Sequence, residues 1–354
     1  MTKPFQRKLD HIEHCSDDRA VCGSHNGLFD QFTFVHNALP ELAMADVDLT
    51  TTFLDSTLRA PLMVTGMTGG PAEAGRINQG IAAVCEELGL AFGVGSQRLL
   101  TRTPNAVDTF AVRDVAPTLV LFGNIGVNQA RDLGPNAVSE LMKAIGADYM
   151  AVHLNAAMEL VQPGAEADSD FRRGYETIAR LTDHLDGRVL VKECGCGIGP
   201  HQVEKLVALG VRAIDVSGSG GTSWVKVEAI RAEGQQASLG ETFADWGIPT
   251  LAATALASPH GGLDVVASGG VDDGLKAAKA LALGARVAGM ARPVLQAFLQ
   301  EGHQGAQTYL ETVIAGIRMA TALTGVRSPS ELQDVPRILG SSLEKWLSIP
   351  KSSP

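Results

Sequence analysis

A histidine, an amide and a carboxylate follow one another closely in the segment His153–Pro163. His153 ends an apolar run and Asn155 lies two residues further on, so in an extended strand both side chains point to the same face. Glu159 follows where a loop or helix is expected to begin. Such groups at the carboxyl end of a strand are typical of an active site. Between them stands Met158, whose thioether cannot donate a proton and accepts hydrogen bonds only weakly.

A lysine inside a second apolar run, Val189–Lys192, is the next residue suited to chemistry. Burying an ammonium group is costly unless it meets an anion or an electron-rich ring. Three Gly-, Ser- and Thr-rich segments follow later apolar runs, at Ser217–Trp224, Ala267–Gly270 and Gly289–Arg292. Consecutive turns of this kind are typical of the phosphate cup of barrel enzymes. Lysine and cup together indicate flavin mononucleotide (FMN), with the lysine near the N1/O2 edge, where reduced flavin carries negative charge.

Eight short apolar runs must position these residues. Most are followed by Gly, Asn or Ser and then by a helical pattern, which predicts parallel strands joined by helices. Eight such units favour a (β/α)8 TIM barrel over a doubly wound sheet. The turn after the first strand, Met67–Gly70, also lacks the Gly-x-Gly-x-x-Gly of a dinucleotide-binding fold. The predicted strands are Pro61–Thr65, Leu90–Val94, Thr118–Phe122, Tyr149–His153, Val189–Lys192, Ala213–Val216, Leu263–Ala267 and Arg286–Met290, and the predicted helices include Ile77–Leu88, Ala137–Ile145, Tyr175–Leu185, Gln202–Leu209 and Leu275–Leu283.

The other segments are interpreted as additions to one FMN-binding barrel domain that spans residues 1–354. Residues 1–58 are polar and irregular, which predicts an N-terminal extension that packs on or caps the barrel. Residues 224–260 predict an insertion between the sixth and seventh strands, and long loops in such positions are often functional. Tyr309–Leu323 and Ser330–Leu347 predict C-terminal helices.

The net charge, the apolar runs and the cysteines limit the kinds of partner and location that can be expected for this chain. The net charge of −10 argues against nucleic-acid binding, which rests on Lys and Arg patches, so a small anionic ligand would need a local basic cluster. The N-terminal residues are polar, without a signal-type run, and no window reaches the roughly 20 apolar residues of a membrane span, so no membrane anchor is expected. The five cysteines are odd in number and scattered, which predicts reduced structural thiols in a cytoplasmic protein. They are Cys15, Cys22, Cys85, Cys194 and Cys196.

Together these motifs resemble the type 2 isopentenyl diphosphate isomerases, which are FMN-dependent (β/α)8 enzymes. The resemblance covers nearly the whole chain. Its Met-Thr-Gly-Gly and Gly-Gly-Thr-Ser-Trp pieces are specific when they occur in this order. The segments that carry it are Arg7-Lys8 with His11, Met67–Gly70, Gly95–Arg98, Asn124, His153–Asn155, Glu159, Val191–Glu193, Asp215–Trp224, Asp245–Thr250 and Ala267–Val271.

The resemblance implies the interconversion of isopentenyl and dimethylallyl diphosphates in isoprenoid biosynthesis, with reduced FMN, Mg2+ and a reductant such as NADPH. It also implies a homo-oligomer, a tetramer or larger. A magnesium ion suits the carboxylate of Glu159 because it takes carboxylate and phosphate oxygens together. By position, the substrate diphosphate would be bound by Arg7, Lys8, Ser96 and Arg98, the catalytic positions would be His153, Asn155 and Met158, and FMN would be bound by Gly66, Met67, Thr68, Ser96, Asn124, Lys192, Ser217, Thr222, Gly269, Gly270, Val271, Ala291 and Arg292.

Met158 departs from the family pattern, which has a glutamine near the substrate double bond. Because a thioether cannot shuttle a proton, two possibilities stay open. Either reduced flavin N5 itself donates and recovers the proton at the allylic carbons, or the chain is a divergent paralogue that acts on another isoprenoid or prenyl diphosphate. Two further departures are Ser219 and Asp272, which stand where many members have arginine.

Three other classes agree less well with the sequence. A 2-hydroxy acid oxidase shares the barrel and FMN but needs a histidine near the turns after strands six and seven, and Ser217–Trp224 contains none. An enzyme like inosine monophosphate dehydrogenase needs a nucleophilic cysteine in the loop after strand six, where none occurs. A non-enzymatic flavin-binding protein would not need diphosphate and metal residues such as Arg98 and Glu159.

Overall fold

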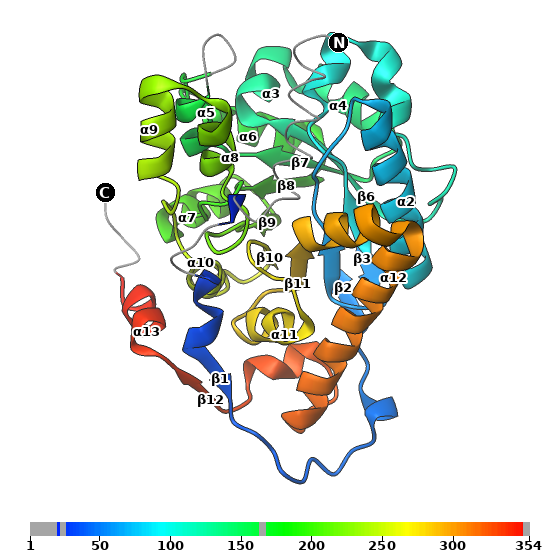
Figure 1. Cartoon of the computed structure of the whole chain (residues 1–354), viewed down its shortest axis with the longest axis vertical. Coiled ribbons are helices and arrows are strands. Elements are labelled where there is room, and N and C mark those ends of the chain that lie inside the picture. The colour runs from blue at the N-terminus through cyan, green and yellow to red at the C-terminus, as the bar shows by residue number, and fades with distance from the viewer. Residues whose placement is uncertain (1–19, 22–25, 163–167, 350–354) are drawn as a thin grey trace.

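The computed structural model describes residues 20–21, 26–162 and 168–349. Its described part is built around a closed barrel of eight parallel strands that follow one another in sequence order (Figure 1). This confirms the predicted TIM barrel, and two strands, β7 (Tyr149–His153) and β8 (Val189–Lys192), have the predicted bounds. The other barrel strands are β4 (Leu62–Val64), β5 (Ala91–Gly93), β6 (Val120–Gly126), β9 (Ala213–Asp215), β10 (Asp264–Ala267) and β11 (Val287–Met290).

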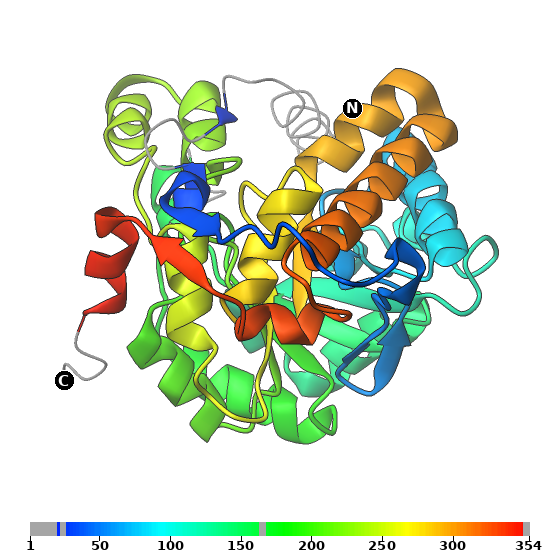
Figure 2. The ribbon, with the colours of Figure 1, turned by 90° about the horizontal axis from the view of Figure 1, so that it is seen from below.

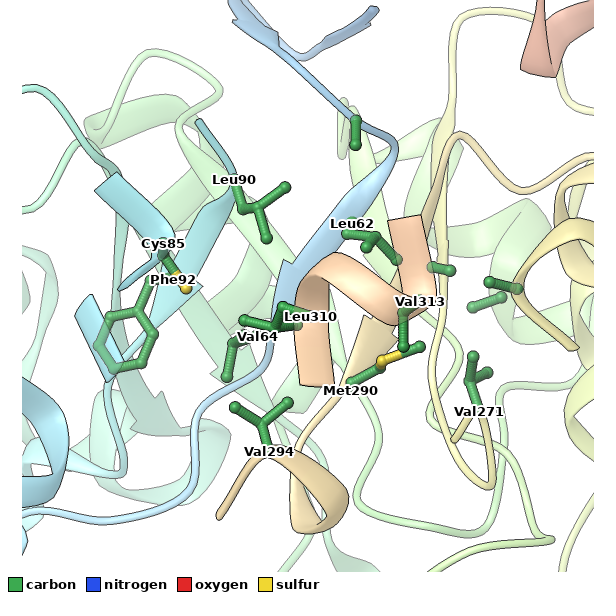
Figure 3. Close-up of a cluster of buried hydrophobic side chains, with 14 of the residues drawn as sticks. Leu62, Val64, Cys85, Leu90, Phe92, Val271, Met290, Val294, Leu310 and Val313 are labelled. Atoms are coloured by element: carbon green, nitrogen blue, oxygen red, sulfur yellow. The ribbon is translucent and has the colours of Figure 1, made fainter. Parts of the chain in front are cut away.

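The barrel strands are buried on both faces. In β4, Leu62 and Val64 point outward into the core between the sheet and the helices, where Val294 and Leu310 also lie (Figure 3). Met63, between them in sequence, belongs instead to the core inside the barrel. Because both faces need apolar side chains, the strands appear in the sequence as unbroken apolar runs.

Helices cover the outside of the barrel in most of the crossovers. The exception lies between β5 and β6, where the described helical elements are the 3-10 helices η4 (Gln97–Thr101) and η5 (Pro104–Thr109). The side chain of Asp273 caps helix α11 (Gly274–Ala282) by accepting a hydrogen bond from the backbone N–H of Lys276 at 2.7 Å. The crossover helices are α2 (Ala72–Leu88), α3 (Val127–Leu133), α4 (Pro135–Ala144), α5 (Ala156–Val161), α6 (Gly174–His184), α7 (Pro200–Ala208) and α11 (Gly274–Ala282).

Three helices occupy the long connection between β9 and β10. Helix α10 (Thr250–Ala257) packs against α7, α11 and β10, as a regular crossover helix does. Helices α8 (Trp224–Arg231) and α9 (Gly234–Thr242) pack on each other and on α5. The extra structure in the segment 224–260 is therefore the α8–α9 pair, which lies at the carboxyl end of the barrel because it follows β9 directly.

A hairpin of the N-terminal extension closes the opposite end of the barrel. A hairpin of β2 (Thr51–Phe53) and β3 (Ser56–Leu58) places Phe53 against Phe122, with ring centroids 5.8 Å apart. Next to it, the backbone N–H of Leu54 donates a hydrogen bond to the Asp264 carboxylate at 2.7 Å. Asp264 is the first residue of β10 and Phe122 lies in the first half of β6, so the hairpin caps the amino-terminal end. The extension also contains η2 (Asn26–Gln31) and η3 (Met44–Asp46).

The C-terminal tail differs from the prediction. Residues 330–347 form part of η7 (Pro329–Gln333), then β12 (Arg337–Leu339) and α13 (Ser341–Leu347), not helix alone. Strand β12 pairs antiparallel with β1 (Phe32–Phe34), close to the other end of the chain (Figure 2). A partner so distant in sequence leaves no local signal, which is why helical periodicity misplaced this strand. The preceding helix, α12 (Arg292–Leu323), begins well before Tyr309 and contains a kink at Glu301 and Gly302.

Among the described residues, none of the helices combines the length and the apolar character needed to cross a membrane.

Candidate active site

Two adjoining cavities open at the carboxyl ends of the barrel strands. The larger cavity has a volume of about 360 Å³, which is within the usual range for small-molecule and cofactor sites. The smaller cavity has a volume of about 90 Å³. The residues common to both walls are Gly66, Met67, Lys192, Cys194 and Trp224.

The wall of the larger cavity is built from glycine-rich turns after β9, β10 and β11. A Cβ on Gly221 would lie 2.4 Å from the backbone nitrogen of Gly270, and a Cβ on Gly269 would lie 2.1 Å from the carbonyl oxygen of Gly218. Only glycine lets the first two turns approach this closely, so their backbone groups surround the cavity. The residues that the sequence assigned to FMN and that line this cavity are Gly66, Met67, Thr68, Lys192, Ser217, Thr222, Gly269, Gly270, Val271, Ala291 and Arg292.

The surroundings of the Thr68 hydroxyl indicate whether this cavity suits a polar cofactor. The hydroxyl oxygen is buried and has no hydrogen-bond partner among the described residues. A buried hydroxyl without a partner is unfavourable, and Thr68 lines the larger cavity. A ligand with hydrogen-bonding groups would satisfy it, so the hydroxyl and the glycine-built wall fit FMN.

Lys192 lies at the junction of the two cavities. Its side chain is 8% exposed, and its Nζ donates a hydrogen bond to the backbone carbonyl of Glu193 at 2.6 Å. Burial alone lowers the pKa of Lys192, but interactions with Cys194, Asp215 and Glu193 outweigh this effect and hold the pKa above its usual value. The side chain is therefore a charged ammonium group at the boundary between the cavities.

The smaller cavity is lined by an oriented histidine. The Nδ1 atom of His153 lies 2.8 Å from Oδ1 of Asn124. The amide nitrogen of Asn124 donates to the Val94 carbonyl at 3.1 Å, which makes Oδ1 the acceptor. His153 must therefore donate from Nδ1, and this assigns its tautomer when it is neutral. A Cβ on Gly126 would come within 2.9 Å of Nε2, so a glycine there makes room for the ring.

Asn155 and Glu159 meet across the first turn of α5. The amide of Asn155 donates to the Glu159 carboxylate at 2.9 Å, and the other carboxylate oxygen accepts the backbone N–H of Asp168 at 2.9 Å. The Met158 sulfur lies 3.8 Å from the same Asn155 amide. No group of three or more His, Cys, Asp or Glu residues suited to a metal ion occurs in the described ranges. A magnesium ion at Glu159 would thus need oxygens from a ligand or water, as magnesium sites commonly have.

The two cavities separate the predicted residues by role. The described residues assigned to the substrate, to catalysis and to the metal line the smaller cavity, together with five assigned to FMN, of which Gly66, Met67 and Lys192 line both cavities. Arg7 and Lys8 lie outside the described residues. The predicted residues that line the smaller cavity and not the larger one are Ser96, Arg98, Asn124, His153, Asn155, Met158 and Glu159.

Several site residues were not assigned from the sequence. Cys194 lines both cavities, and its place two residues after Lys192 is the signal that could have revealed it. The side-chain amide of Gln162 lies 3.5 Å from the Glu228 carboxylate, which is fully buried and paired with Arg231 at 2.5 Å. This buried network joins α5 to α8. Trp224, which lines both cavities, closes the Gly-Gly-Thr-Ser-Trp motif but received no role.

Comparisons with known proteins agree with this geometry. A family model described as FMN-dependent dehydrogenase matches residues 151–337. An isopentenyl-diphosphate delta-isomerase from Nostoc sp. is 42% identical over 333 residues, which cover 92% of this chain and 93% of the relative. An isopentenyl-diphosphate delta-isomerase from Pyrococcus furiosus is 38% identical over 355 residues, with 98% and 89% covered.

Solved structures of more distant sequence share the fold. A flavocytochrome b2 variant with sulfite bound superposes with a TM-score of 0.69 at 19% identity, covering 97% of this chain and 86% of that one. A mandelate oxidase variant superposes with a TM-score of 0.66 at 16% identity, covering 96% and 100%. Such identities show the barrel alone. The relatives near 40% identity over almost the whole chain decide the family: this protein belongs to the isopentenyl-diphosphate delta-isomerases and is an enzyme of their FMN-dependent type.

Proposed function

We propose that this enzyme converts isopentenyl diphosphate to dimethylallyl diphosphate, with FMN in the larger cavity and the substrate in the smaller one. One observation carries the proposal: residues assigned to cofactor and to substrate line two adjoining cavities that share Lys192. The relatives from Nostoc sp. and Pyrococcus furiosus, both isopentenyl-diphosphate delta-isomerases, support the proposed substrate.

In the larger cavity, the glycine-rich turns would hold the FMN phosphate with their backbone N–H groups, together with Thr222 and Arg292. The Thr68 hydroxyl would gain the partner that it lacks. The ammonium group of Lys192 would lie against the ring edge that becomes negative when the flavin is reduced. When bound and reduced, FMN supplies proton-exchange chemistry beside the substrate double bond. NADPH is the proposed reductant.

In the smaller cavity, Ser96 and Arg98 would bind the substrate diphosphate, joined by Arg7 and Lys8 from the N-terminal extension. A guanidinium group suits this task because it forms paired, charge-assisted hydrogen bonds with phosphate oxygens. His153, fixed by Asn124, would orient a phosphate oxygen when its ring is protonated. These residues supply the local positive charge that the chain, at −10 overall, otherwise lacks.

Glu159 is the proposed magnesium ligand. Its carboxylate is 3% exposed and is already oriented by hydrogen bonds from the Asn155 amide and the Asp168 backbone. Glu159 would hold the magnesium ion, which would supply positive charge that offsets the negative charge of the substrate diphosphate. We also propose a cytoplasmic homo-oligomer, a tetramer or larger, on the basis of the family resemblance.

Met158 favours a second candidate, a divergent enzyme of this family that acts on another prenyl diphosphate or isoprenoid. Its sulfur lies in the smaller cavity next to the Asn155 amide, where it can neither donate nor shuttle a proton. It makes this wall more apolar, which suits a longer or more cation-like hydrocarbon group.

An anaerobic product assay tests the proposal. The purified protein is incubated with FMN, NADPH, Mg2+ and isopentenyl diphosphate, and dimethylallyl diphosphate is measured. We expect product that depends on FMN and on reductant. Calorimetric titration with isopentenyl diphosphate, with and without Mg2+, separates the candidates. Binding without product would favour the divergent enzyme, whereas absence of binding would contradict a prenyl diphosphate substrate of this size.

A further inference from the structure

Three buried ionisable side chains lie beneath the junction of the two cavities. Lys192 and Glu193 of the β8 end are each 8% exposed, and Asp215 at the end of β9 is 1% exposed. Lys192 and Asp215 are paired neighbours in the parallel register of these strands. A buried ammonium group needs a counter-charge, and the two carboxylates that can provide it here are Glu193 and Asp215.

The Glu193 carboxylate points back into the turn that follows β8. Its Oε2 atom accepts the backbone N–H of Cys194 at 2.6 Å and also that of Cys196. Burial raises the pKa of Glu193 to about 7 despite these donors. Its negative charge is therefore only partly present at neutral pH, and it serves chiefly to shape the turn after β8.

Asp215 has the environment of a lasting carboxylate. Its Oδ1 atom accepts the hydroxyl of Ser268 at 2.6 Å and the backbone N–H of Ser217 at 3.1 Å. Burial raises the pKa of Asp215, while the Lys192 ammonium and these donors act in the opposite direction. The Lys192 ammonium is the strongest of the influences that favour the ionised form of Asp215, and the two residues are paired in the strand register, so we assign the negative charge to Asp215.

We propose that Asp215 is a positioning residue that keeps the Lys192 ammonium charged at the cavity junction and thereby sets the reduction potential of the bound flavin. The inference rests on the proposed FMN site. A fixed positive charge beside the ring favours the reduced flavin, which carries negative charge. The groups that face Lys192 are His153 from β7, Glu193 and Cys194 from its own strand end, and Asp215 from β9.

Replacing Asp215 by Asn removes the counter-charge and leaves the volume unchanged. The Lys192 ammonium would then be buried without a lasting partner, so its pKa should fall. A lysine is charged below its pKa and neutral above it. The variant should therefore keep the ammonium in acidic solution and lose it as the pH rises, whereas the parent protein keeps it throughout.

The test is the midpoint potential of FMN in the purified holoprotein from pH 6 to pH 10. For Asp215→Asn, we expect a potential that falls progressively below that of the parent as the pH increases. Glu193→Gln is the matched control, because it removes the adjacent carboxylate and leaves Asp215. Below pH 7, where Glu193 is largely protonated, it should parallel the parent, and above pH 8 its fall should be smaller than that of Asp215→Asn. Lys192→Met should have a low potential at every pH. Adding Asp215→Asn to Lys192→Met should produce no further pH-dependent difference.

A potential of Asp215→Asn that runs parallel to the parent would overturn the inference. So would a pH-dependent fall that persists in the Lys192→Met background, because Asp215 would then act without Lys192. If Asp215→Asn does not retain flavin, Ser268→Ala replaces it; removing the 2.6 Å donor should give a smaller change in the same direction. The potential is measured without any isoprenoid, so the result does not depend on which substrate the enzyme uses. A parent protein that bound no FMN would contradict the proposed function instead.

Discussion

His153 donates a hydrogen bond from Nδ1 to the side-chain oxygen of Asn124, across 2.8 Å between neighbouring strands β7 and β6. Asn124→Asp would place a carboxylate at this position. A carboxylate at hydrogen-bond distance favours imidazolium, so the charged form of His153 should persist to higher pH than in the parent protein. NMR titration of the imidazole protons measures this change. The exposed His184 of α6 is the internal control, and an unchanged His153 would show that the two side chains do not meet in solution.

Arg98 should be essential for the diphosphate and dispensable for the flavin. It lines the smaller cavity only. Since a hydrogen bond to a charged group contributes about 1.5–3 kcal/mol, Arg98→Ala should weaken isopentenyl diphosphate binding by roughly ten- to a hundredfold. Calorimetry measures this, and FMN affinity should stay the same. Arg102→Ala, an exposed arginine just after η4, is the control; equal losses in both variants would mean a long-range charge effect.

The barrel strands could be predicted where both faces of the strand are buried. Strands β7 and β8 have the predicted bounds because nearly all of their side chains are buried, on both faces of the strand. Each strand therefore appears in the sequence as an apolar run of the same length. Strand β12 was missed because only its pairing with β1 defines it. Its central residue Ile338 is 64% exposed, so no buried pattern marks it.

The site residues that belong to sequence motifs could be predicted from the sequence. Residues at strand ends, such as Lys192 and Asn155, fall where parallel strands bring them together. The sequence did not assign Glu228, because its role comes from a contact with Gln162 between α5 and α8, which only the packing of these helices creates. Asp215 was part of a motif, but its charge depends on Ser268 from the next strand.

Met158→Gln should raise isomerase activity. The substituted amide can donate and accept hydrogen bonds at the wall where the thioether does neither well. Because positioned proton-transfer groups contribute about 10²–10⁴-fold, we expect a gain of at least tenfold in turnover in the anaerobic assay. Met158→Leu keeps the wall apolar and should show no gain. Equal turnover in all three proteins would mean that proton transfer does not pass through this position.

Phe53 should stabilise the barrel without affecting the site. It is fully buried at the amino-terminal end and stacks on Phe122. Phe53→Ala removes a large side chain from a packed core, which typically costs about 3–5 kcal/mol. Urea denaturation should show a lowered midpoint, while FMN affinity of the folded protein stays the same. Thr52→Ala, at the exposed neighbouring position of β2, should change stability by about 0.5 kcal/mol or less. A loss of FMN affinity in Phe53→Ala would show that the two ends are coupled.

Cys194 should report on both ligands through its reactivity. Burial raises the pKa of its thiol to about 11, so the thiol is neutral at pH 7 and the reactive thiolate increases about tenfold per pH unit up to that value. Alkylation by iodoacetamide should therefore accelerate steadily from pH 7 to pH 10. Because Cys194 lines both cavities, FMN should slow the reaction, and isopentenyl diphosphate with Mg2+ should slow it further.

Peptide mapping by mass spectrometry gives the rate at each cysteine in one sample. Cys196 is the matched control, because it lies two residues away with similar partial exposure but does not contribute to the lining of either cavity. We expect its rate to change little when the ligands are added. Protection of both thiols to the same extent would indicate a general tightening of the turn after β8. Protection of neither, under conditions in which calorimetry shows both ligands bound, would place the ligands away from the shared wall and contradict the arrangement of the two cavities proposed for FMN and substrate.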